Sequence, residues 1–475
     1  MFRKVLIANR GEIAVRLIRA CRELGVATAL ACSEADRGAL PARLADEVVV
    51  IGPAHPRDSY LRVEAVVDAA RSCGADAVHP GYGFLAERPE LSDACRRAGI
   101  TFVGPSPESM RLLGEKTAAK TLAERLGVPT VPGYHGDDQS DERLIREADV
   151  VGFPLLVKAA AGGGGRGVRL VRTAAELPDA LASARREAEA AFGDGRLLLE
   201  RLIAPARHVE VQAVADAHGH VVHLGERECS IQRRHQKLVE EAPSPAVDER
   251  LRRQLGEAAT TVVRAAGYLG VATVEFLLDP DGSFFFLEVN PRLQVEHPVT
   301  ELVTGVDLVH LQLQIAAGAP LPFGQRDVAL RGHAVEVRLY AEDPWQDFRP
   351  AVGRLTAFAP PTIEGVRHDV GVAPGDEVTP FYDPLLGKLI AWGATREQAR
   401  RRALAALRAY EVEGVPTNLS LLEAVLDHPR FADGALSTDF LDSHVTGGEW
   451  RPPRLPPEVL VGAAAFEIAD RTGGT

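Results

Sequence analysis

The sequence predicts an α/β protein that begins with a parallel β-sheet and continues with α+β units. Two observations support this fold class. Strand-like and helix-like runs alternate over residues 1–112, and beyond Thr130 strand-like runs also follow one another directly. Alternating strands and helices are typical of parallel sheets, whereas successive strands form antiparallel hairpins. A chain of 475 residues exceeds the size of a single core, so we expect two to four domains.

Short apolar runs define the strands of the first unit. They read KVLIANR, ATALACS, EVVVIG, AVHPGYG and ITFVGP, and helical patterns at 12–24, 61–71 and 89–98 lie between them. Ligands of parallel sheets bind at the carboxyl ends of the strands. The segment His79–Phe84, with Glu87 just beyond it, lies at such an end and is a candidate binding loop. Packing of a core loop is the alternative, and the motif alone does not decide between them.

The later elements predict two further units and a tail. A helix at 116–126 precedes the strands PLLVKAA, VRLV and RLLLERLI, which accompany a helix at 174–191. The strands HVEVQAVAD and HVVHLGERECS follow, and a last unit combines GHAVEVRLY, GRLTAFA and KLIAWG with a helix at 396–410. The expected division is 1–113, 114–330 with a subdomain at about 131–203, 331–446, and a linker or tail at 447–475.

The composition excludes several classes of function. The net charge of −12 argues against nucleic acid as the main partner, because phosphate backbones bind to basic surfaces. No apolar stretch approaches the about 18 residues of a membrane span, and the first strand begins at once, so we expect neither a membrane segment nor a signal peptide. The five cysteines are odd in number and lack CxxC spacing, which favours reduced thiols and a cytoplasmic location.

The segment 271–297 predicts a hairpin with an internal conflict of charge. Two apolar runs flank the turn sequence DPDG, which is a strong hairpin signal. If Asp279 faces Phe284 and the pairing sum is constant along the ladder, Glu275 lies opposite Glu288. Directly opposed side chains have Cβ atoms about 4.5–5.5 Å apart, where like charges are destabilising. A cation between the two carboxylates would resolve the conflict.

The same hairpin offers a third oxygen ligand. Side chains alternate along a strand, so Glu288 and Asn290 point to one face. Three oxygen-bearing side chains, Glu275, Glu288 and Asn290, therefore converge, as a hard cation such as Mg²⁺ requires. An exposed sheet face with solvated acids is the alternative.

The segment PLLVKAAAGGGGRGVRL predicts a glycine-rich loop between two strands. Gly162, Gly164 and Gly167 match G-x-G-x-x-G, but a dinucleotide fold needs a helix there and the strand VRLV follows instead. Such a loop lays its N–H groups over phosphates as a lid, with Lys158 supplying charge. The sequence GEKT at 114–117 lacks both the adjacent Gly-Lys pair and the leading glycine of a Walker motif. A flexible loop without a ligand is the alternative.

Lysine is rare in this chain, which uses arginine for most of its cations. The lysines are Lys4, Lys116, Lys120, Lys158, Lys237 and Lys388. A lysine in such a chain indicates a position where a compact point charge is useful, for example beside phosphate oxygens. Chance is the alternative for any one of them.

Glycine loop, separated lysines and paired acids together resemble the ATP-grasp enzymes, and within them the biotin carboxylase family. The resemblance covers about residues 2–445 and is carried by ordered strings. They are IANRGEIAVR, HPGYGFLAE, KAAAGGGGRGVR, RHVEVQ, ERECSIQRRHQK, EEAP, EVNPRLQVEHPVTE, RGHAVEVRLYAEDP and YDPLLGKLI. It implies an ATP-grasp fold with a Rossmann-like N-terminal domain, a mobile glycine-rich lid subdomain and a C-terminal α+β domain.

The resemblance implies a role for each matching position. For the nucleotide these are the phosphate-binding Lys116 and Lys158, the lid glycines Gly163, Gly164 and Gly165, the adenine hinge Glu200, Arg201 and Ile203, and the ribose and phosphate end His208, Gln232, His235 and Lys237. For the metal ions they are Glu275, Glu288 and Asn290. For bicarbonate they are Arg292, Gln294 and Val295, with Glu296 as the base. For biotin they are Arg338, which stabilises the enolate, and Tyr82 near the ureido ring.

The resemblance also implies cofactors and partners. The cofactors are ATP, Mg²⁺ or Mn²⁺, and biotin on a carrier protein. The only methionines, Met1 and Met110, do not adjoin a lysine, so biotin is presented in trans, and a carboxyltransferase and a second copy of the chain are expected partners. The function implied is a component of an acyl-CoA carboxylase, such as the acetyl-CoA carboxylase of fatty acid biosynthesis. Another ATP-grasp carboxylate ligase and a non-catalytic nucleotide-binding scaffold are the alternatives.

Overall fold

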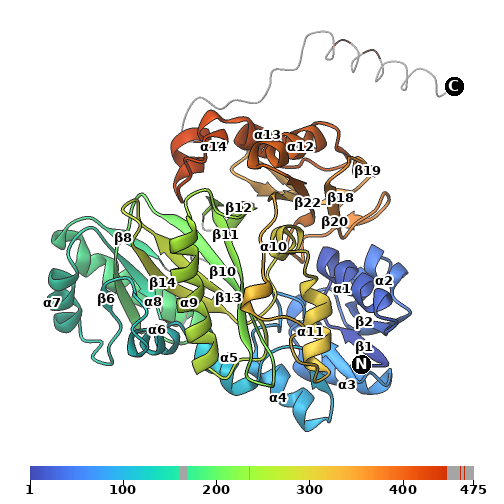
Figure 1. Ribbon diagram of the computed structural model, residues 1–475, viewed down its shortest axis with the longest axis horizontal. Coiled ribbons are helices and arrows are strands. Elements are labelled where there is room, and N and C mark those ends of the chain that lie inside the picture. Colours follow the sequence, from blue (N-terminus) through green and yellow to red (C-terminus); the bar gives the residue numbers. More distant parts are fainter. Residues whose placement is uncertain (161–167, 235, 447–460, 462–464, 466–475) are drawn as a thin grey trace.

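A five-stranded parallel sheet forms the N-terminal unit of the protein (Figure 1). The computed structural model describes residues 1–160, 168–234 and 236–446, together with Val461 and Ala465. The strand order is β3-β2-β1-β4-β5, and every neighbouring pair is parallel, as predicted. The strands are β1 (Lys4–Ile7), β2 (Ala27–Ser33), β3 (Glu47–Gly52), β4 (Ala77–His79) and β5 (Thr101–Phe102).

Helices cover both faces of this sheet. Val5 and Ile7 of β1 belong to a core shared with Leu17 of the first helix, while Leu6 between them packs in a second core with Val66. This alternation is what a sheet buried on two faces requires. The helices of the unit are α1 (Gly11–Glu23), α2 (Leu40–Leu44), α3 (Val63–Ser72), α4 (Pro89–Arg97) and α5 (Pro107–Gly114).

An eight-stranded sheet forms the centre of the molecule, in the order β14-β13-β10-β11-β12-β15-β22-β20. The strands are β10 (Arg207–Ala215), β11 (Val221–Arg233), β12 (Gln236–Ala242), β13 (Gly270–Leu278), β14 (Phe284–Asn290), β15 (His333–Tyr340), β20 (Val366–Val370) and β22 (Leu385–Gly393). It runs without a break from the central unit into the expected C-terminal unit, because β12 and β15 pair antiparallel. α9 (Glu249–Ala265) packs on β10 and β11, and α10 (His297–Thr304) packs on β12 and β15.

A small sheet in the order β6-β9-β7-β8 stands apart from the central sheet (Figure 1). It contains β6 (Gly133–Tyr134), β7 (Leu155–Ala159), β8 (Arg169–Val171) and β9 (Leu197–Arg201), and it packs with α7 (Asp141–Val151) and α8 (Leu177–Phe192). β7 and β8 pair antiparallel, so the glycine run joins two strands, as predicted. The lid glycines Gly163, Gly164 and Gly165 lie outside the described residues, as do His235 and nearly all of the expected tail at 447–475.

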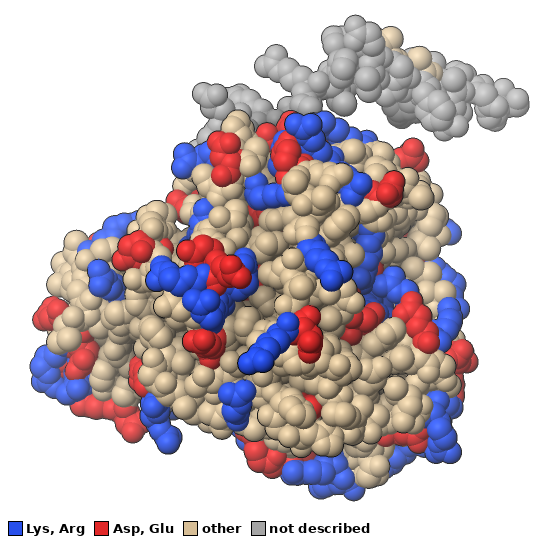
Figure 2. All heavy atoms as spheres, in the orientation of Figure 1, with Lys and Arg blue, Asp and Glu red and all other residues tan. Residues whose placement is uncertain are grey.

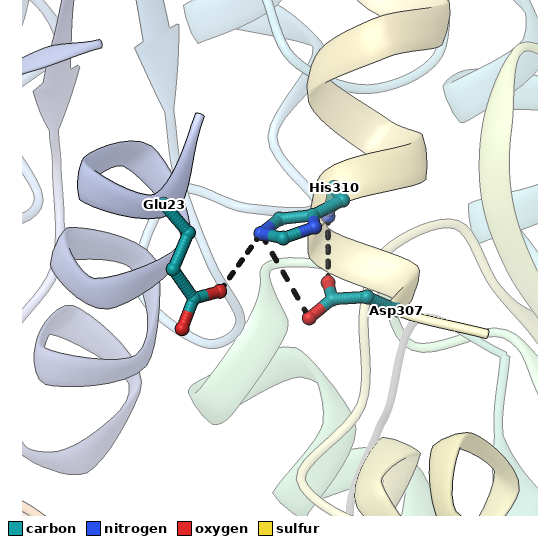
Figure 3. A group of neighbouring side chains, drawn as sticks. All are labelled: Glu23, Asp307 and His310. Atoms are coloured by element: carbon teal, nitrogen blue, oxygen red, sulfur yellow. Dashed lines mark hydrogen bonds and ion pairs between the residues drawn. The ribbon is translucent and has the colours of Figure 1, made fainter. Parts of the chain in front are cut away.

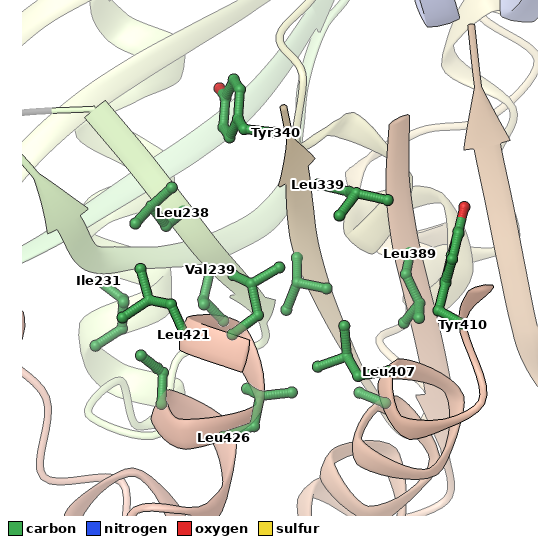
Figure 4. Packing of buried hydrophobic residues seen from close by; sticks show 14 of the residues in the cluster. Ile231, Leu238, Val239, Leu339, Tyr340, Leu389, Leu407, Tyr410, Leu421 and Leu426 are labelled. Carbon is green, nitrogen blue, oxygen red and sulfur yellow. The ribbon is translucent and has the colours of Figure 1, made fainter. Parts of the chain in front are cut away.

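The C-terminal elements surround the largest hydrophobic core (Figure 4). In it, leucines and valines of β12, β15 and β22 pack against α12 (Arg396–Arg408) and α13 (Leu419–Asp427). The segment GRLTAFA, expected as one strand, is divided into β18 (Gly353–Arg354) and β19 (Ala357–Ala359), which pair with different partners. Buried Leu355 separates the two, so the segment turns into the core between them.

The surface carries both signs of charge. On the face drawn in Figure 2, Lys and Arg are interspersed with Asp and Glu over all the units that the structure describes. Among the described residues, no helix is long and apolar enough to cross a membrane.

Candidate active site

The hairpin of β13 and β14 places two carboxylates opposite each other. Glu275 pairs with Glu288, as predicted, and Thr273 pairs with Asn290. The prediction of a constant pairing sum was wrong, because the register shifts between Glu275 and Phe276 and Leu278, not Asp279, pairs with Phe284. A β-bulge causes such a shift by opposing two residues to one.

The end of this hairpin opens into a cavity of about 940 Å³. Its wall combines residues of β12 to β15 with the loop that follows β14 and with the start of α6 (Lys116–Arg125). Most of the side chains that the sequence singled out line it, namely Lys116, His208, Lys237, Glu275, Glu288, Asn290, Arg292, Gln294, Val295, Glu296 and Arg338. Segments far apart in the sequence therefore meet at one polar cavity.

Lys237 is the centre of a buried network of charges. Its Nζ lies 2.5 Å from Glu210, 2.9 Å from Glu275 and 2.8 Å from Glu296. Burial lowers the pKa of Lys237, but the three carboxylates outweigh it and hold the pKa well above its ordinary value. The lysine is therefore a permanent cation.

Glu275 and Glu288 are each paired with basic side chains. Glu275 accepts from Lys237 and lies 2.9 Å from His208 Nε2, whereas Glu288 lies 2.9 Å from Lys116 Nζ. Although burial raises the pKa of Glu275, Lys237 and His208 lower it well below its ordinary value, so the carboxylate is ionised. These contacts compensate the negative charges of the two opposed carboxylates within the protein itself.

The donor set of the hairpin suits a hard divalent cation. Glu275 and Glu288 offer carboxylate oxygens, and Asn290 offers an amide oxygen while its amide nitrogen donates to Glu275 at 2.8 Å. Mg²⁺ prefers oxygen ligands and is held by one or two carboxylates. Another group with metal-ligand geometry, His208, Glu210 and Glu275, also contains Glu275, but there Glu210 is already bound by Arg227 at 2.6 Å and by Lys237.

Arg338 also lines the cavity, where it lies between two glutamates. Its Nε donates to Glu240 at 2.6 Å and a terminal nitrogen donates to Glu296 at 2.9 Å. Burial lowers the pKa of Arg338, but Glu240 and Glu296 raise it well above its ordinary value. Burial raises the pKa of Glu296, and Lys237 and Arg338 reverse this and hold it well below its ordinary value.

Arg292 lies in the loop after β14 and contacts Glu87 and Asn290. Its Nε donates to Glu87 at 2.5 Å and a terminal nitrogen donates to Asn290 at 3.2 Å. Glu87 comes from the loop after β4 that the sequence marked as a candidate binding loop, and Phe84 and Glu87 of this loop line the cavity. Gln294 is buried, where its side chain accepts from Arg227 and donates to Glu275.

The base of the small sheet carries an ion pair that sequence reasoning partly missed. Glu200 contacts Lys158 and lies 3.1 Å from Lys120. Burial raises the pKa of Glu200, but the two ammonium groups lower it to about 2. Lys120 was noted only as one of six lysines, and its position one turn after Lys116 in a helix was the available signal. Beyond Glu200, Arg201 is exposed and Ile203 is partly exposed.

Tyr82 lies in a second cavity of about 430 Å³ that shares Arg292, Val295 and Arg338 with the first. The tyrosine hydroxyl donates to Glu12, which also lies 3.3 Å from Lys388 Nζ. Lys388 in turn donates to the backbone oxygen of Val295. The buried Lys388 was not assigned a role from sequence. At the nucleotide end, Gln232 contacts His208 Nδ1 at 2.8 Å.

A further group of possible metal ligands lies away from the cavity. His310 Nε2 lies 3.0 Å from Glu23 and 4.0 Å from Asp307. Figure 3 shows the histidine ring between the two carboxylates. Asp307 is the N-cap of α11 (Leu308–Ala316), where it accepts from the His310 backbone, and it also binds Arg16 at 2.6 Å. These contacts connect α1 to α11.

A lid-like antiparallel sheet and a cavity lined by lysines and hairpin carboxylates are features of the ATP-grasp class of ligases. Three family models match the chain in sequence. They are biotin carboxylase N-terminal domain at 1–110, carbamoyl-phosphate synthase L chain ATP-binding domain at 115–323, and biotin carboxylase C-terminal domain at 336–443. The chain belongs to the biotin carboxylase family of ATP-dependent ligases.

Relatives and solved structures agree with this assignment. The chain is 49% identical to a biotin carboxylase of Halalkalibacterium halodurans over 95% of its length and all of the relative. It is 48% identical to the alpha subunit of a Dictyostelium discoideum methylcrotonoyl-CoA carboxylase over 93% of its length, but spans only 63% of that protein. The biotin carboxylase domain of Hydrogenobacter thermophilus 2-oxoglutarate carboxylase, solved as a dimer with MgADP and bicarbonate, superimposes with a TM-score of 0.92 at 44% identity, covering 95% of this chain and all of that one.

Proposed function

We propose that this chain carboxylates biotin on a carrier protein, using ATP and bicarbonate by way of carboxyphosphate. The observation that carries the proposal is the single cavity in which the hairpin carboxylates, Lys237, Arg292, Glu296 and Arg338 meet. In that reaction a bicarbonate oxygen attacks the γ-phosphate of ATP, which releases ADP. The carboxyphosphate then gives phosphate and CO₂, which is captured by biotin. Two anions must meet in line, so positioning and neutralisation of charge dominate the catalysis.

The nucleotide end of the cavity supplies the positive charge in this proposal. Glu275, Glu288 and Asn290 would hold Mg²⁺, which when bound neutralises phosphate charge and orients the reacting oxygens. When the nucleotide binds, Lys116 exchanges its contact with Glu288 for the phosphates, and Lys158 exchanges its contact with Glu200 in the same way. Lys237 stays between its carboxylates and presents its charge to the γ-phosphate. The lid glycines and the adenine hinge Glu200–Ile203 complete the nucleotide site.

Arg292 and Glu296 form the bicarbonate end. The planar guanidinium of Arg292 matches the planar anion, which a lysine does not. Gln294 and the backbone of Val295 fix its orientation, and Glu296 accepts its proton. Because Lys237 and Arg338 hold the pKa of Glu296 low, the carboxylate becomes a better base when Arg338 turns away from it. Arg338 turns to the biotin enolate oxygen, so arrival of biotin and activation of Glu296 are coupled.

The biotin end combines Arg338 with the second cavity. Arg338 stabilises the negative charge that develops on the ureido oxygen when the ring N–H is lost to the released phosphate. Tyr82 and its partner Glu12 border the ring. Lid closure keeps water from the carboxyphosphate.

The wider assembly is part of the same proposal. The chain would act with a biotin carboxyl carrier protein and a carboxyltransferase as one component of an acyl-CoA carboxylase, of which the acetyl-CoA carboxylase of fatty acid biosynthesis is one kind, and it would form a homodimer like the neighbour described above. We also propose that the chain is divided into domains at 1–113, 114–330 and 331–446, with the lid at about 131–203 and a tail after 446. Five free, buried cysteines support a reducing location such as the cytoplasm.

Phosphate release measures this function directly. We expect ATP hydrolysis that requires Mg²⁺ and bicarbonate and that free biotin accelerates. A carboxylate ligase with another substrate would hydrolyse ATP without response to biotin. A scaffold would bind nucleotide and release no phosphate.

Replacement of Glu87 by glutamine is expected to lower the KM for bicarbonate. In the free protein Glu87 occupies Arg292, and binding of bicarbonate must displace it. Because Glu87 is 44% exposed, its ion pair with Arg292 is weak, and we expect the KM for bicarbonate to fall by about two- to fivefold. Initial rates against bicarbonate concentration measure it. Glu90→Gln, on the exposed surface of α4, is the control, and an unchanged or higher KM in Glu87→Gln would refute the assigned role of Arg292.

A further inference from the structure

A second pair of opposed carboxylates lies beneath Arg338. Glu240 of β12 pairs directly with Glu336 of β15, and both side chains are completely buried. Opposed side chains in an antiparallel pair are about 4.5–5.5 Å apart at Cβ. Arg338, two residues after Glu336 on the same strand, lies on the same face of the sheet. This acid pair is therefore adjacent to the residue assigned to biotin.

The two acids differ in their hydrogen bonds. One oxygen of Glu240 accepts from Arg338, at 2.6 Å from Nε and 2.5 Å from a terminal nitrogen. The other oxygen of Glu240, and both oxygens of Glu336, are buried and have no hydrogen-bond partner within the described residues. An ionised carboxylate buried without partners is very costly, whereas the protonated acid costs far less.

The charges around Glu336 come from four elements of the fold. They are Glu240 on β12, Arg338 on β15, Lys388 on β22 and Glu296 before α10. Both cations are engaged elsewhere, since Arg338 binds Glu240 and Glu296, and Lys388 binds Glu12 and the Val295 backbone. α10 also carries His297, which is buried and whose pKa lies well below its ordinary value because of burial and Lys388, so it adds no charge.

We propose that Glu336 holds a proton in the working enzyme and is a positioning residue, because it leaves Glu240 as the only ionised member of the acid pair beside Arg338. Two like charges at this distance do not both ionise, and Glu240 is the member that ionises first: burial raises its pKa to about 7, and the charge of Arg338 limits the rise. Burial, with a contribution from Glu240, raises the pKa of Glu336 well above its ordinary value, which agrees with this assignment. The role in biotin carboxylation rests on the proposed function, whereas the bound proton does not.

A proton bound to Glu336 makes the stability of the protein depend on pH, and this can be measured without an activity assay. A carboxyl whose folded pKa is raised above its unfolded pKa binds a proton more tightly in the folded state. Its contribution to stability is therefore lost as pH rises from about 4.5 toward the folded pKa. Glu336→Gln is shaped like the protonated acid and removes this loss. We expect the unfolding temperature of Glu336→Gln, relative to wild type, to rise steadily between pH 5 and pH 8.5.

Glu241→Gln is the matched control, since Glu241 is the next residue on β12 and is equally buried. Burial raises its pKa, but hydrogen bonding to His333 and the charge of Arg396 reverse this, so its folded pKa lies below the ordinary value. Its contribution to stability is present at neutral pH and is lost as pH falls. Glu241→Gln should therefore be less stable than wild type by a nearly constant amount between pH 8.5 and pH 5, and the difference should shrink only below about pH 4.5.

If the unfolding temperature of Glu336→Gln relative to wild type is constant with pH, or falls as pH rises, Glu336 does not hold the proposed proton. Glu336→Met, also neutral and of similar volume, gives the same test if the glutamine variant does not fold.

The positioning role is measured by the ratio of biotin-dependent to biotin-independent ATP hydrolysis. In wild type this ratio should fall at alkaline pH as Glu336 ionises and competes for Arg338, and in Glu336→Gln the fall should be smaller. An equal fall in both would refute positioning. An absence of biotin stimulation in wild type would refute the proposed function instead.

Discussion

Glu288→Gln is expected to lower Mg²⁺-dependent ATP hydrolysis by about 100-fold or more, because it removes one of two carboxylates proposed to hold the metal. The side chain is 27% exposed and faces the cavity, and its partner Lys116 is also partly exposed. The fold therefore loses little, and the change acts on the metal. Steady-state hydrolysis against Mg²⁺ concentration measures it, with a higher Mg²⁺ requirement as the expected sign.

Asp281→Asn is the matched control for this variant. Asp281 is an exposed carboxylate in the turn of the same hairpin, where it accepts from the Ser283 backbone. It lies at the opposite end of the hairpin from the cavity, so its loss should leave the Mg²⁺ requirement unchanged. Normal Mg²⁺-dependent activity in Glu288→Gln would show that the metal is bound elsewhere.

Arg338→Ala is expected to lower biotin-dependent turnover by about 100- to 1,000-fold, the usual effect of removing a group that stabilises an oxyanion. Nucleotide affinity should change far less, because Arg338 contacts Glu240 and Glu296, whereas the phosphate-binding Lys116 and Lys158 contact Glu288 and Glu200. The substitution also leaves Glu240 and Glu296 without their shared cation. Hydrolysis without biotin, nucleotide binding and biotin carboxylation, measured side by side, separate these effects.

Arg396→Ala controls for the loss of a buried ion pair. Arg396 binds Glu241 of β12 at 2.7 Å, on the face of the strand opposite to Glu240, and does not line the cavity. It should lower stability and leave the biotin-dependent and biotin-independent rates in their normal ratio. If Arg338→Ala merely lowered both rates equally, its role would be structural and not specific to biotin.

The hairpin shows how far local sequence patterns reach. Turn chemistry and the alternation of side chains were enough to place Glu275 opposite Glu288. The bulge between that pair and the turn was not predicted, because turn chemistry and side-chain alternation do not describe how the phenylalanines pack. Phe276 meets Phe284 and Phe286 edge to face in the core under α9, and such contacts leave no periodic signal in the sequence.

Contacts between distant segments were the part that the sequence did not reveal. The residues 331–446 form a unit with its own helices, yet β15 pairs with β12, and this pairing brings Arg338 beside Glu240. The acids Glu210, Glu240 and Glu336 lie in the strings RHVEVQ, EEAP and RGHAVEVRLYAEDP, but they were assigned no role from sequence and gained meaning only from that sheet. The rarity of lysine was a better guide than expected. Lys116, Lys237 and Lys388 each contact a residue that lines the cavity, and Lys120 and Lys158 share the adenine-hinge residue Glu200.

A crystal grown with a nonhydrolysable ATP analogue and Mn²⁺ would test the metal site most directly, since manganese is located by its anomalous scattering. We expect a peak bound by Glu275 and Glu288, with Asn290 beside it and phosphate oxygens completing the coordination. A peak on His208 and Glu210, or a nucleotide bound with both hairpin carboxylates turned away from any metal, would contradict this account.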